Sequence, residues 1–412
     1  MSERALLCAA VDRMHAAQCD FLAGLVRIAT DNPPGDCAPA AEAAADALGR
    51  LGFSVEKHPV PDSLVAANGM VSATNLVVRH RFGPGPVIAL NAHGDVVPPG
   101  AGWSVDPYAA TVRDGVMYGR GVAVSKSDFA TYAFALKALL ESGLALEGGV
   151  ELHFTFDEEA GGAIGPAWLI ERGIVKPDFA ICAGFAYNIV VAHDGCLHLE
   201  VSVAGRSAHA AEPQNGADAL EAATEILAAL YAYRDGLAAV RSSVPGIVHP
   251  TLVVGLIKGG INTNVVPDLV TLRLDRRIVP EEDPVAVERA LVAAIEAAAG
   301  RAKPGIAVSV RRVLLAMPFT QVPGQERLVA LLQRNARAVL AEEIPANGVP
   351  LYTDARHYAA AGIPTVLYGA GPHSLLEANG HRADERLVLD DLRKATQVIA
   401  LTLADLLSRG SP

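Results

Sequence analysis

Two adjacent acids are the first candidates for chemistry. Glu158 and Glu159 directly follow a short apolar run and are closed by Gly161 and Gly162. Successive residues in extended backbone point in opposite directions, so one carboxylate could hold a metal ion while its neighbour moves a proton. The plainer interpretation of two neighbouring acids is a solvated turn. Their position at the end of a predicted strand favours a chemical role.

Two histidines are the next candidates. His93 is followed two residues later by Asp95, and a metal-binding histidine usually has its second ring nitrogen oriented by a carboxylate. His381 lies further along, in a polar segment that contains a glycine. Taken singly, His93 is equally well explained as a core histidine bonded to the backbone, and His381 as an ordinary loop residue.

The segments around these residues predict alternating strands and helices. Apolar residues 86–91 form a strand that runs into His93, and the alternating residues 150–156 form a strand that ends near Glu158. A helix is expected over residues 127–142. This alternation predicts an α/β protein with a mostly parallel sheet covered by helices. Ligands of such proteins gather at the carboxyl ends of the strands.

The middle of the chain has a different order of predicted strands and helices. Residues 196–314 predict strands and helices in the order β-α-β-β-α-β, which is typical of a small independent α+β domain. Residues 315–412 again resemble the first part of the chain in their pattern of strands and helices, with helices expected over 326–341 and 390–408. We therefore expect residues 1–195 and 315–412 to form a catalytic domain. Residues 196–314 would form an inserted lid and dimerisation domain.

Several longer motifs accompany these candidates in a fixed order. They are His93-Gly94-Asp95-Val96-Val97-Pro98, Tyr118-Gly119-Arg120-Gly121, the segment 154–162, Gly205-Arg206-Ser207-Ala208-His209, the segment 264–268, Asp275-Arg276-Arg277, Thr353-Asp354-Ala355-Arg356 and the segment around His381. In these motifs the chain resembles the family of acetylornithine deacetylases, succinyl-diaminopimelate desuccinylases, aminoacylases and carboxypeptidase G-type enzymes. The resemblance covers nearly the whole chain and keeps the order of the family's motifs.

The resemblance implies a role for each matching residue. His93, Glu159 and His381 would bind metal, and Asp95 would orient the ring of His93. Glu158 would act as general base and then as general acid.

Four further residues would act on the substrate if the resemblance holds. His209 and Asn264 would stabilise the oxyanion that develops on the attacked carbonyl. Arg277 would hold a substrate carboxylate, and Arg356 would also bind the substrate. Because the lid histidine serves the partner subunit in many relatives, the resemblance also implies a homodimer.

Two positions depart from the family pattern, and both normally carry metal. Val124 stands where the family has a bridging aspartate, and Gly184 stands where it has a further acid. Neither side chain can bind a cation. Asp128, one helical turn beyond Val124, is a possible replacement, although a charge on a helix surface is the plainer interpretation.

The surviving set of ligands predicts a smaller metal site. Two imidazoles and one carboxylate, from His93, His381 and Glu159, are enough to hold one divalent ion together with a water molecule. We therefore expect a mononuclear site, with zinc as the preferred ion and cobalt or manganese as alternatives. The loss of two carboxylates together with one divalent ion leaves no buried charge unpaired.

Bulk properties exclude other classes of function. The formal net charge of −11 disfavours binding to nucleic acid or to an anionic membrane surface. Five cysteines without a CxxC pair are typical of reduced thiols in a cytosolic protein. Residues 1–19 predict an amphipathic helix instead of a signal peptide, and no apolar run approaches the ~20 residues of a membrane span. A cytoplasmic enzyme with a small-molecule substrate is expected.

The leading hypothesis is hydrolysis of an amide bond, peptide or N-acyl, in a small substrate that bears a carboxylate, such as an N-acyl amino acid or a dipeptide. One alternative is a metal-independent activity that uses Glu158 with Ser125, Lys126 and Ser127. Another is a non-catalytic relative that binds a small carboxylate.

Overall fold

The computed structural model describes residues 2–408 of the chain. Contacts divide these residues into two compact units. Unit 1 comprises residues up to Val191, Gln321–Asn347 and the segment from Thr353 onward. Unit 2 comprises Ala192–Thr320 and Gly348–Tyr352. No helix among residues 2–408 is long and apolar enough to cross a membrane.

The core of unit 1 is a large mixed sheet. Its strand order is β1-β2-β6-β3-β7-β14-β8-β13. The strands are β1 (Val55–Pro59), β2 (Thr74–Arg81), β3 (Val87–His93), β6 (Gly149–Thr155), β7 (Phe179–Cys182), β8 (Ile189–His193), β13 (Ala346–Val349) and β14 (Thr365–Leu367). Strands β6, β3, β7 and β14 pair in parallel, whereas β1 pairs antiparallel with β2, β2 with β6, and β8 with β14. The α/β class is confirmed, and the sheet is mixed, with parallel pairing in the run β6-β3-β7-β14.

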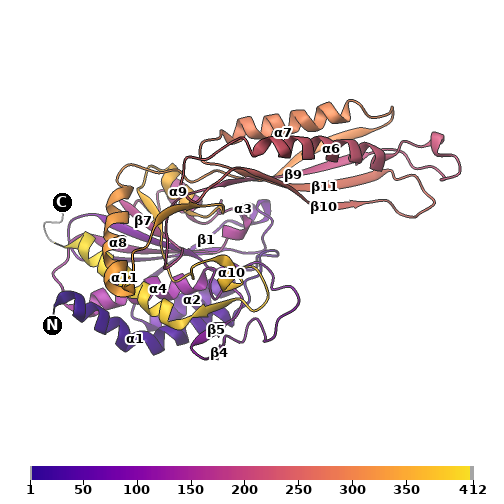
Figure 1. Cartoon of the computed structure of the whole chain (residues 1–412). Helices are drawn as coiled ribbons and strands as arrows, with labels where there is room; N and C mark the ends of the chain where they lie inside the picture. The colour runs from indigo at the N-terminus through magenta and orange to yellow at the C-terminus, as the bar shows by residue number, and fades with distance from the viewer. Residues whose placement is uncertain (1, 409–412) are drawn as a thin grey trace. The chain divides into compact units, whose positions relative to one another are not determined.

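Helices surround this sheet (Figure 1). They are α1 (Glu3–Val26), α2 (Ala38–Arg50), α3 (Asp62–Ala67), α4 (Lys126–Ser142), α5 (Pro166–Glu171), α8 (Gln325–Leu340), α9 (Ala355–Ala360), α10 (Leu375–Ala378) and α11 (Leu389–Leu407). A second small antiparallel sheet pairs β5 (Val116–Tyr118) with β4 (Thr111–Arg113) and β15 (Arg386–Val388).

Helix α4 lies inside the unit, because it packs against α1, α11 and the strands β3 and β6. Its sequence, KSDFATYAFALKALLES, is apolar on nearly every side, which is typical of a buried helix. Phe129 stacks on Phe154 of β6 with ring centroids 3.9 Å apart. This packing fixes the start of α4 beside the carboxyl ends of the central strands.

Unit 2 has the element order β-α-β-β-α-β. Its elements are β9 (Gly195–Ala204), α6 (Ala219–Leu237), β10 (Thr251–Gly259), β11 (Leu269–Ile278), α7 (Pro284–Ala299) and β12 (Ala307–Ala316). The four strands form an antiparallel sheet in the order β10-β11-β9-β12. Helices α6 and α7 lie along one face of it (Figure 1), where Leu197, Leu199 and Val201 of β9 contribute to the core.

Candidate active site and metal centre

The register of two parallel strands brings the predicted residues to one edge of the sheet. His93 is the last residue of β3 and pairs with Thr155, the last residue of β6. The backbone N–H of Gly94 donates to the carbonyl of Thr155 at 2.8 Å. Asp95 and Glu158 therefore leave adjacent strands at the same point, although they are far apart in the sequence.

Asp95 organises this edge through hydrogen bonds. Its fully buried carboxylate accepts the backbone N–H of Glu158 at 3.2 Å and that of Glu159 at 3.0 Å. It also accepts the side-chain amide of Asn32 at 3.0 Å. These contacts hold the short 3₁₀ turn Glu158–Ala160 against the end of β3. Asn32 was missed in the sequence, since an asparagine before two prolines indicates only a turn.

His93 is held in one orientation by Asp95. Its Nδ1 lies 3.0 Å from the carbonyl oxygen of Asp95 and 3.3 Å from the carboxylate. Because both of those oxygens accept hydrogen bonds, Nδ1 carries the proton. The other ring nitrogen, Nε2, lies 4.0 Å from Oε2 of Glu158. When the ring is neutral, Nε2 is therefore the nitrogen that can bind a metal ion.

Three side chains form a group that can hold a cation. Within residues 2–408, ligand atoms of His93, Glu158 and Glu159 all lie within 4.8 Å of one another. His381 stands outside this group, but its Nε2 lies 3.3 Å from Oε1 of Glu159. Its side chain is about half exposed, at 52%. Imidazole nitrogen with carboxylate oxygen suits zinc, cobalt or manganese.

Buried negative charge gives independent support for a cation. Asp95, Asp157, Glu158 and Asp354 are all at most 9% exposed. Oδ1 of Asp157 and Oδ1 of Asp354 are buried without a hydrogen-bond partner. Several carboxylates cannot be buried together unless protons or a cation compensate their charge. The residues present therefore fit a bound divalent ion.

The same surroundings shift the pKa of the acids. Burial raises the pKa of Glu158 to about 8, the charges of Glu159 and Asp95 add to this shift, and His93 opposes it. Burial together with the charge of Glu158 raises the pKa of Asp354 to about 7. Burial alone would lower the pKa of His93, but the hydrogen bond to Asp95 and the charge of Glu158 raise it well above its usual value.

The backbone is constrained at both positions that lack a ligand. The N–H of Val124 donates to Oε1 of Glu385 at 3.2 Å, and Glu385 is paired with the buried Arg120 at 2.6 Å. A Cβ at Gly184 would lie 2.8 Å from the backbone nitrogen of Tyr368, so no larger side chain fits this path of the chain. Gly184 therefore opens no extra room for a substrate and leaves no room for the acid that the family has there.

Asp128 is not a surface charge, as the plainer interpretation held. It is 1% exposed, and its carboxylate accepts the backbone N–H groups of Ala370 at 2.8 Å and Gly184 at 3.2 Å. Burial raises the pKa of Asp128 to about 7. Its oxygens are not part of the cation-binding group around Glu158, which leaves it a structural link between α4 and two loops.

The three residues of the metal-independent hypothesis all donate side-chain hydrogen bonds to backbone carbonyls. The hydroxyl of Ser125 donates to the carbonyl of His93 at 3.0 Å. Lys126 donates to the carbonyls of Leu25 and Ile28, at 3.2 and 2.8 Å, and so closes the end of α1. The hydroxyl of Ser127 donates to the carbonyl of Ala123, in the segment before α4, at 3.4 Å. These contacts disfavour a reaction centred on the three residues.

Arg356 is a buried anchor of the loop that carries Glu158. It is 5% exposed, and its guanidinium donates to the carbonyl oxygens of Gly161 and Thr353. Gly161 closes the 3₁₀ turn of Glu158. These bonds indicate that Arg356 positions that turn. The substrate-binding role implied by the resemblance remains a prediction.

Unit 2 places His209 beside Asn264. Residue 209 forms an antiparallel bridge with Val265, and the N–H of Ala210 donates to the carbonyl of Asn264 at 3.0 Å. Nδ1 of His209 accepts the N–H of Ala211 at 3.1 Å, so the neutral ring carries its proton on Nε2. Both side chains belong to exposed residues. A hydrogen-bond donor is thus available on this loop.

Arg277 is held in place by Asp275. Its Nε and Nη2 donate to the two carboxylate oxygens of Asp275 at 3.0 and 3.1 Å. Its guanidinium carbon lies 5.9 Å from the ring centroid of Tyr352. The arginine is therefore oriented in advance of any ligand.

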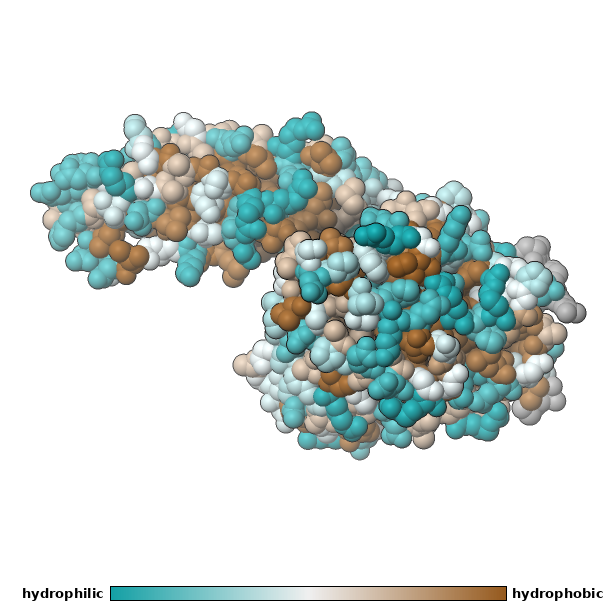
Figure 2. Space-filling view, turned by 180° about the vertical axis from the view of Figure 1, so that it is seen from behind, coloured by the Kyte–Doolittle hydropathy of each residue, from teal (hydrophilic) through white to brown (hydrophobic). Residues whose placement is uncertain are grey.

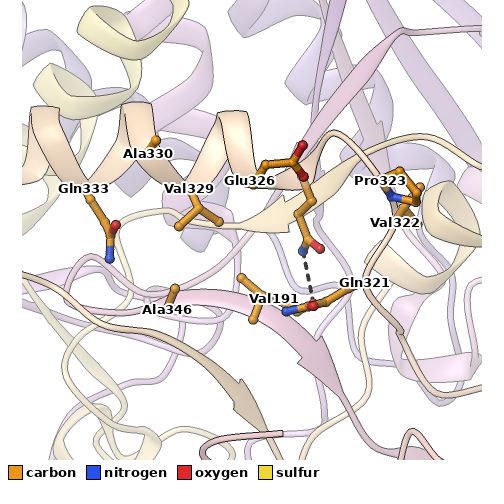
Figure 3. A pocket seen from close by; sticks show the side chains of 10 residues that line it. Val191, Gln321, Val322, Pro323, Glu326, Val329, Ala330, Gln333 and Ala346 are labelled. Carbon is orange, nitrogen blue, oxygen red and sulfur yellow. Dashed lines mark hydrogen bonds between the residues drawn. The ribbon is translucent and has the colours of Figure 1, made fainter.

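A separate cavity of about 570 Å³ lies in unit 1 beside α8 (Figure 3). Val191, Val329 and Ala346 line it together with Gln325, whose side-chain amide donates to the carbonyl of Val191 at 3.0 Å. No residue predicted to do chemistry lines this cavity.

Comparisons with known proteins agree with the fold. Residues 89–405 match the model of peptidase family M20/M25/M40. The chain is 30% identical over 373 residues to the succinyl-diaminopimelate desuccinylase of Gluconacetobacter diazotrophicus, which covers 88% of this chain and 90% of that protein. The acetylornithine deacetylase of Proteus mirabilis is 32% identical over 237 residues, 57% of this chain and 58% of that protein. Among solved structures, the di-peptidase Dug1p from Saccharomyces cerevisiae superposes with a TM-score of 0.81 at 14% identity, covering 98% of both chains.

The class that fold and site define is therefore that of the metal-dependent peptidases and amidohydrolases. The chain belongs to peptidase family M20/M25/M40. Some of the curated relatives align over less than two thirds of their own length, as the Proteus mirabilis deacetylase does. The family resemblance expected from the motifs is confirmed.

Proposed function

We propose that this protein hydrolyses the amide bond of a small, carboxylate-bearing N-acyl amino acid or dipeptide, with Glu158 as general base and acid. The observation that carries the proposal is the position of the Glu158 carboxylate, buried among ligand atoms of His93 and Glu159 within 4.8 Å. A general base works best when its pKa lies near the working pH. Burial brings the pKa of Glu158 to about 8.

We infer that His93, Glu159 and His381 would hold a single divalent ion, zinc or alternatively cobalt or manganese. When bound, such an ion polarises the carbonyl of the amide and increases the acidity of water. The absence of ligating side chains at Val124 and Gly184 supports one ion over two. The contact of 3.3 Å between His381 and Glu159 supports a shared role for these two residues.

In the proposed reaction Glu158 removes a proton from the attacking water and then transfers it to the leaving nitrogen. Asp95 keeps the ring of His93 and the turn of Glu158 in position. Donation by Nε2 of His209 and by the side chain of Asn264 would stabilise the oxyanion. Arg277, already aligned by Asp275, would hold the substrate carboxylate.

The test is an assay of N-acyl amino acids and dipeptides with and without added zinc, cobalt or manganese. Glu158→Gln is expected to lower kcat by about 10²–10⁴-fold with little change in KM, because proton transfer is lost while shape is kept. Glu171→Gln, on the exposed end of α5, is the matched control and should retain full activity. Thermal stabilisation by these compounds without any turnover, unchanged in Glu158→Gln, would instead favour a binding protein.

We also propose a homodimer formed through unit 2. Strand β10 is an edge strand, and its residues Val253, Leu256 and Ile257 are 56–62% exposed. Hydrophobic residues reach the surface of this unit in patches (Figure 2, upper left). Exposed apolar edge strands are sites of pairing between chains. Light scattering should give twice the chain mass, and Leu256→Asp with Ile257→Asp should reduce it to a monomer.

A further inference from the structure

A second cluster of metal-ligating side chains lies on the face of the unit 2 sheet opposite helices α6 and α7. Cys196 and His198 are two residues apart on β9, so they point to the same face. That face is opposite to the one on which Leu197 and Leu199 join the hydrophobic core. Asp275 of β11 pairs directly with His198, and Arg277 pairs with Cys196.

Two of the ligand atoms contact the third, which is a carboxylate oxygen of Asp275. Sγ of Cys196 lies 3.6 Å and Nε2 of His198 lies 3.0 Å from Oδ2 of Asp275. All three ligand atoms lie within 4.8 Å of one another. With ordinary zinc bond lengths, tetrahedral geometry places sulfur about 3.5 Å and nitrogen about 3.3 Å from a carboxylate ligand oxygen. These two separations are therefore close to those of a formed site.

We propose that Cys196, His198 and Asp275 bind a thiophilic divalent cation of the zinc class, with water as the fourth ligand. The side chains of His198 and Asp275 are 35% and 31% exposed, so water has access to that position. Cys196 itself is fully buried, which shields its sulfur. On binding, the thiol loses its proton to solvent and its sulfur forms the bond to the cation.

The arrangement differs from that of a nucleophilic cysteine. In such sites the thiol donates to an imidazole, which is oriented in turn by a carboxylate. Here the thiol and the imidazole both contact Oδ2 of the same carboxylate, side by side. Arg277 contacts the same group, with Nε on Oδ1 at 3.0 Å and Nη2 on Oδ2 at 3.1 Å. A cation at Oδ2 would replace the Nη2 contact and leave the Nε contact in place.

The donor sets make this site distinguishable from the one at Glu158. The set of His93, Glu158, Glu159 and His381 contains nitrogen and oxygen only, whereas the unit 2 cluster contains sulfur. A bound Co²⁺ ion therefore produces a thiolate-to-cobalt charge-transfer band in the near ultraviolet only from the cluster. This readout does not depend on whether the protein hydrolyses any amide.

The experiment is a titration of chelator-treated protein with Co²⁺ alone, followed by absorption spectroscopy. We expect the thiolate band together with the visible bands of tetrahedral cobalt. Cys196→Ser should abolish the thiolate band, and Glu159→Ala should retain it. Cys8→Ser, a partly exposed cysteine of α1, is the matched control and should also retain it.

Two results would overturn the proposal. One is a wild-type protein that shows no thiolate band at saturating Co²⁺, and the other is a band that persists unchanged in Cys196→Ser. If circular dichroism shows that Cys196→Ser does not fold, His198→Ala serves in its place, because His198 is partly exposed. That variant should lose the thiolate-to-cobalt band, and its retention at full intensity would equally contradict the site.

Discussion

The carboxylate of Asp95 accepts the backbone N–H of Glu159 at 3.0 Å while its other oxygen accepts the N–H of Glu158 at 3.2 Å. The same residue holds Nδ1 of His93. One buried residue thus fixes the proposed base and two proposed metal ligands relative to one another, through its carboxylate and its backbone carbonyl. An orienting contact of this kind typically contributes 10–100-fold in metal affinity or activity.

Asp95→Asn tests this arrangement directly. An amide has one acceptor oxygen in place of two, so one of the two N–H groups loses its partner. We expect kcat or metal affinity to fall by about 10–100-fold. Steady-state kinetics and metal titration measure both. Asn32→Ala, which removes only the third hydrogen bond to Asp95, should have a smaller effect. Equal activity of Asp95→Asn and wild type would contradict the orienting role.

Substitution of Gly184 tests whether any side chain fits at this position. Because a Cβ there would meet the backbone of Leu367 and Tyr368 at 2.8–2.9 Å, Gly184→Ala should lower the free energy of unfolding by about 1–3 kcal/mol. Denaturant unfolding measures the change. Gly24→Ala is the control, since Gly24 has open space within α1, and it should be neutral or stabilising by up to about 1 kcal/mol. A fully stable Gly184→Ala protein would show that the loop moves freely.

The buried Asp128 should make stability depend on pH. Burial raises the pKa of Asp128 from 3.8 to about 7, so between these values the folded protein keeps a proton that the unfolded chain releases. Stability must then fall as pH rises through this window, because the folded state binds more protons. Between pH 5 and pH 8 we expect wild type to lose about 1–3 kcal/mol relative to Asp128→Asn.

Thermal unfolding of both proteins at the two pH values measures this difference. Asp46→Asn, which removes an exposed acid of α2, is the control for the loss of a surface charge. If the difference between wild type and Asp128→Asn is the same at pH 5 and pH 8, the carboxyl of Asp128 does not titrate in this range.

The edge of the sheet that carries the candidate site could be predicted from the sequence. The apolar run before His93 and the alternation before Glu158 each indicate a strand, and parallel strands end at a common edge. What could not be predicted is the register that pairs His93 with Thr155, since it depends on how the whole sheet assembles. The second role of Asp95, on the turn of Glu158, follows from that register.

The prediction that Asp128 is a surface charge was wrong because it did not take into account the apolar pattern of the helix that contains it. Helix α4 is apolar on nearly all sides, and this pattern indicates burial. A buried acid must find partners, and Asp128 finds them in two loops distant in sequence. Likewise, the alternation of β9 places Cys196 and His198 on one face, but only the pairing with β11 brings Asp275 to them.

The most direct test of metal-assisted hydrolysis is the activity of chelator-treated Cys196→Ser protein during stepwise addition of zinc, cobalt or manganese. The Cys196→Ser substitution removes the second proposed metal site, so that it does not contribute to the number of ions bound per chain. We predict no amide hydrolysis before addition and a rate that saturates at one ion per chain, with no gain in Glu159→Ala. Full turnover by the metal-free protein, or saturation only at two ions per chain, would contradict a single-ion site beside Glu158.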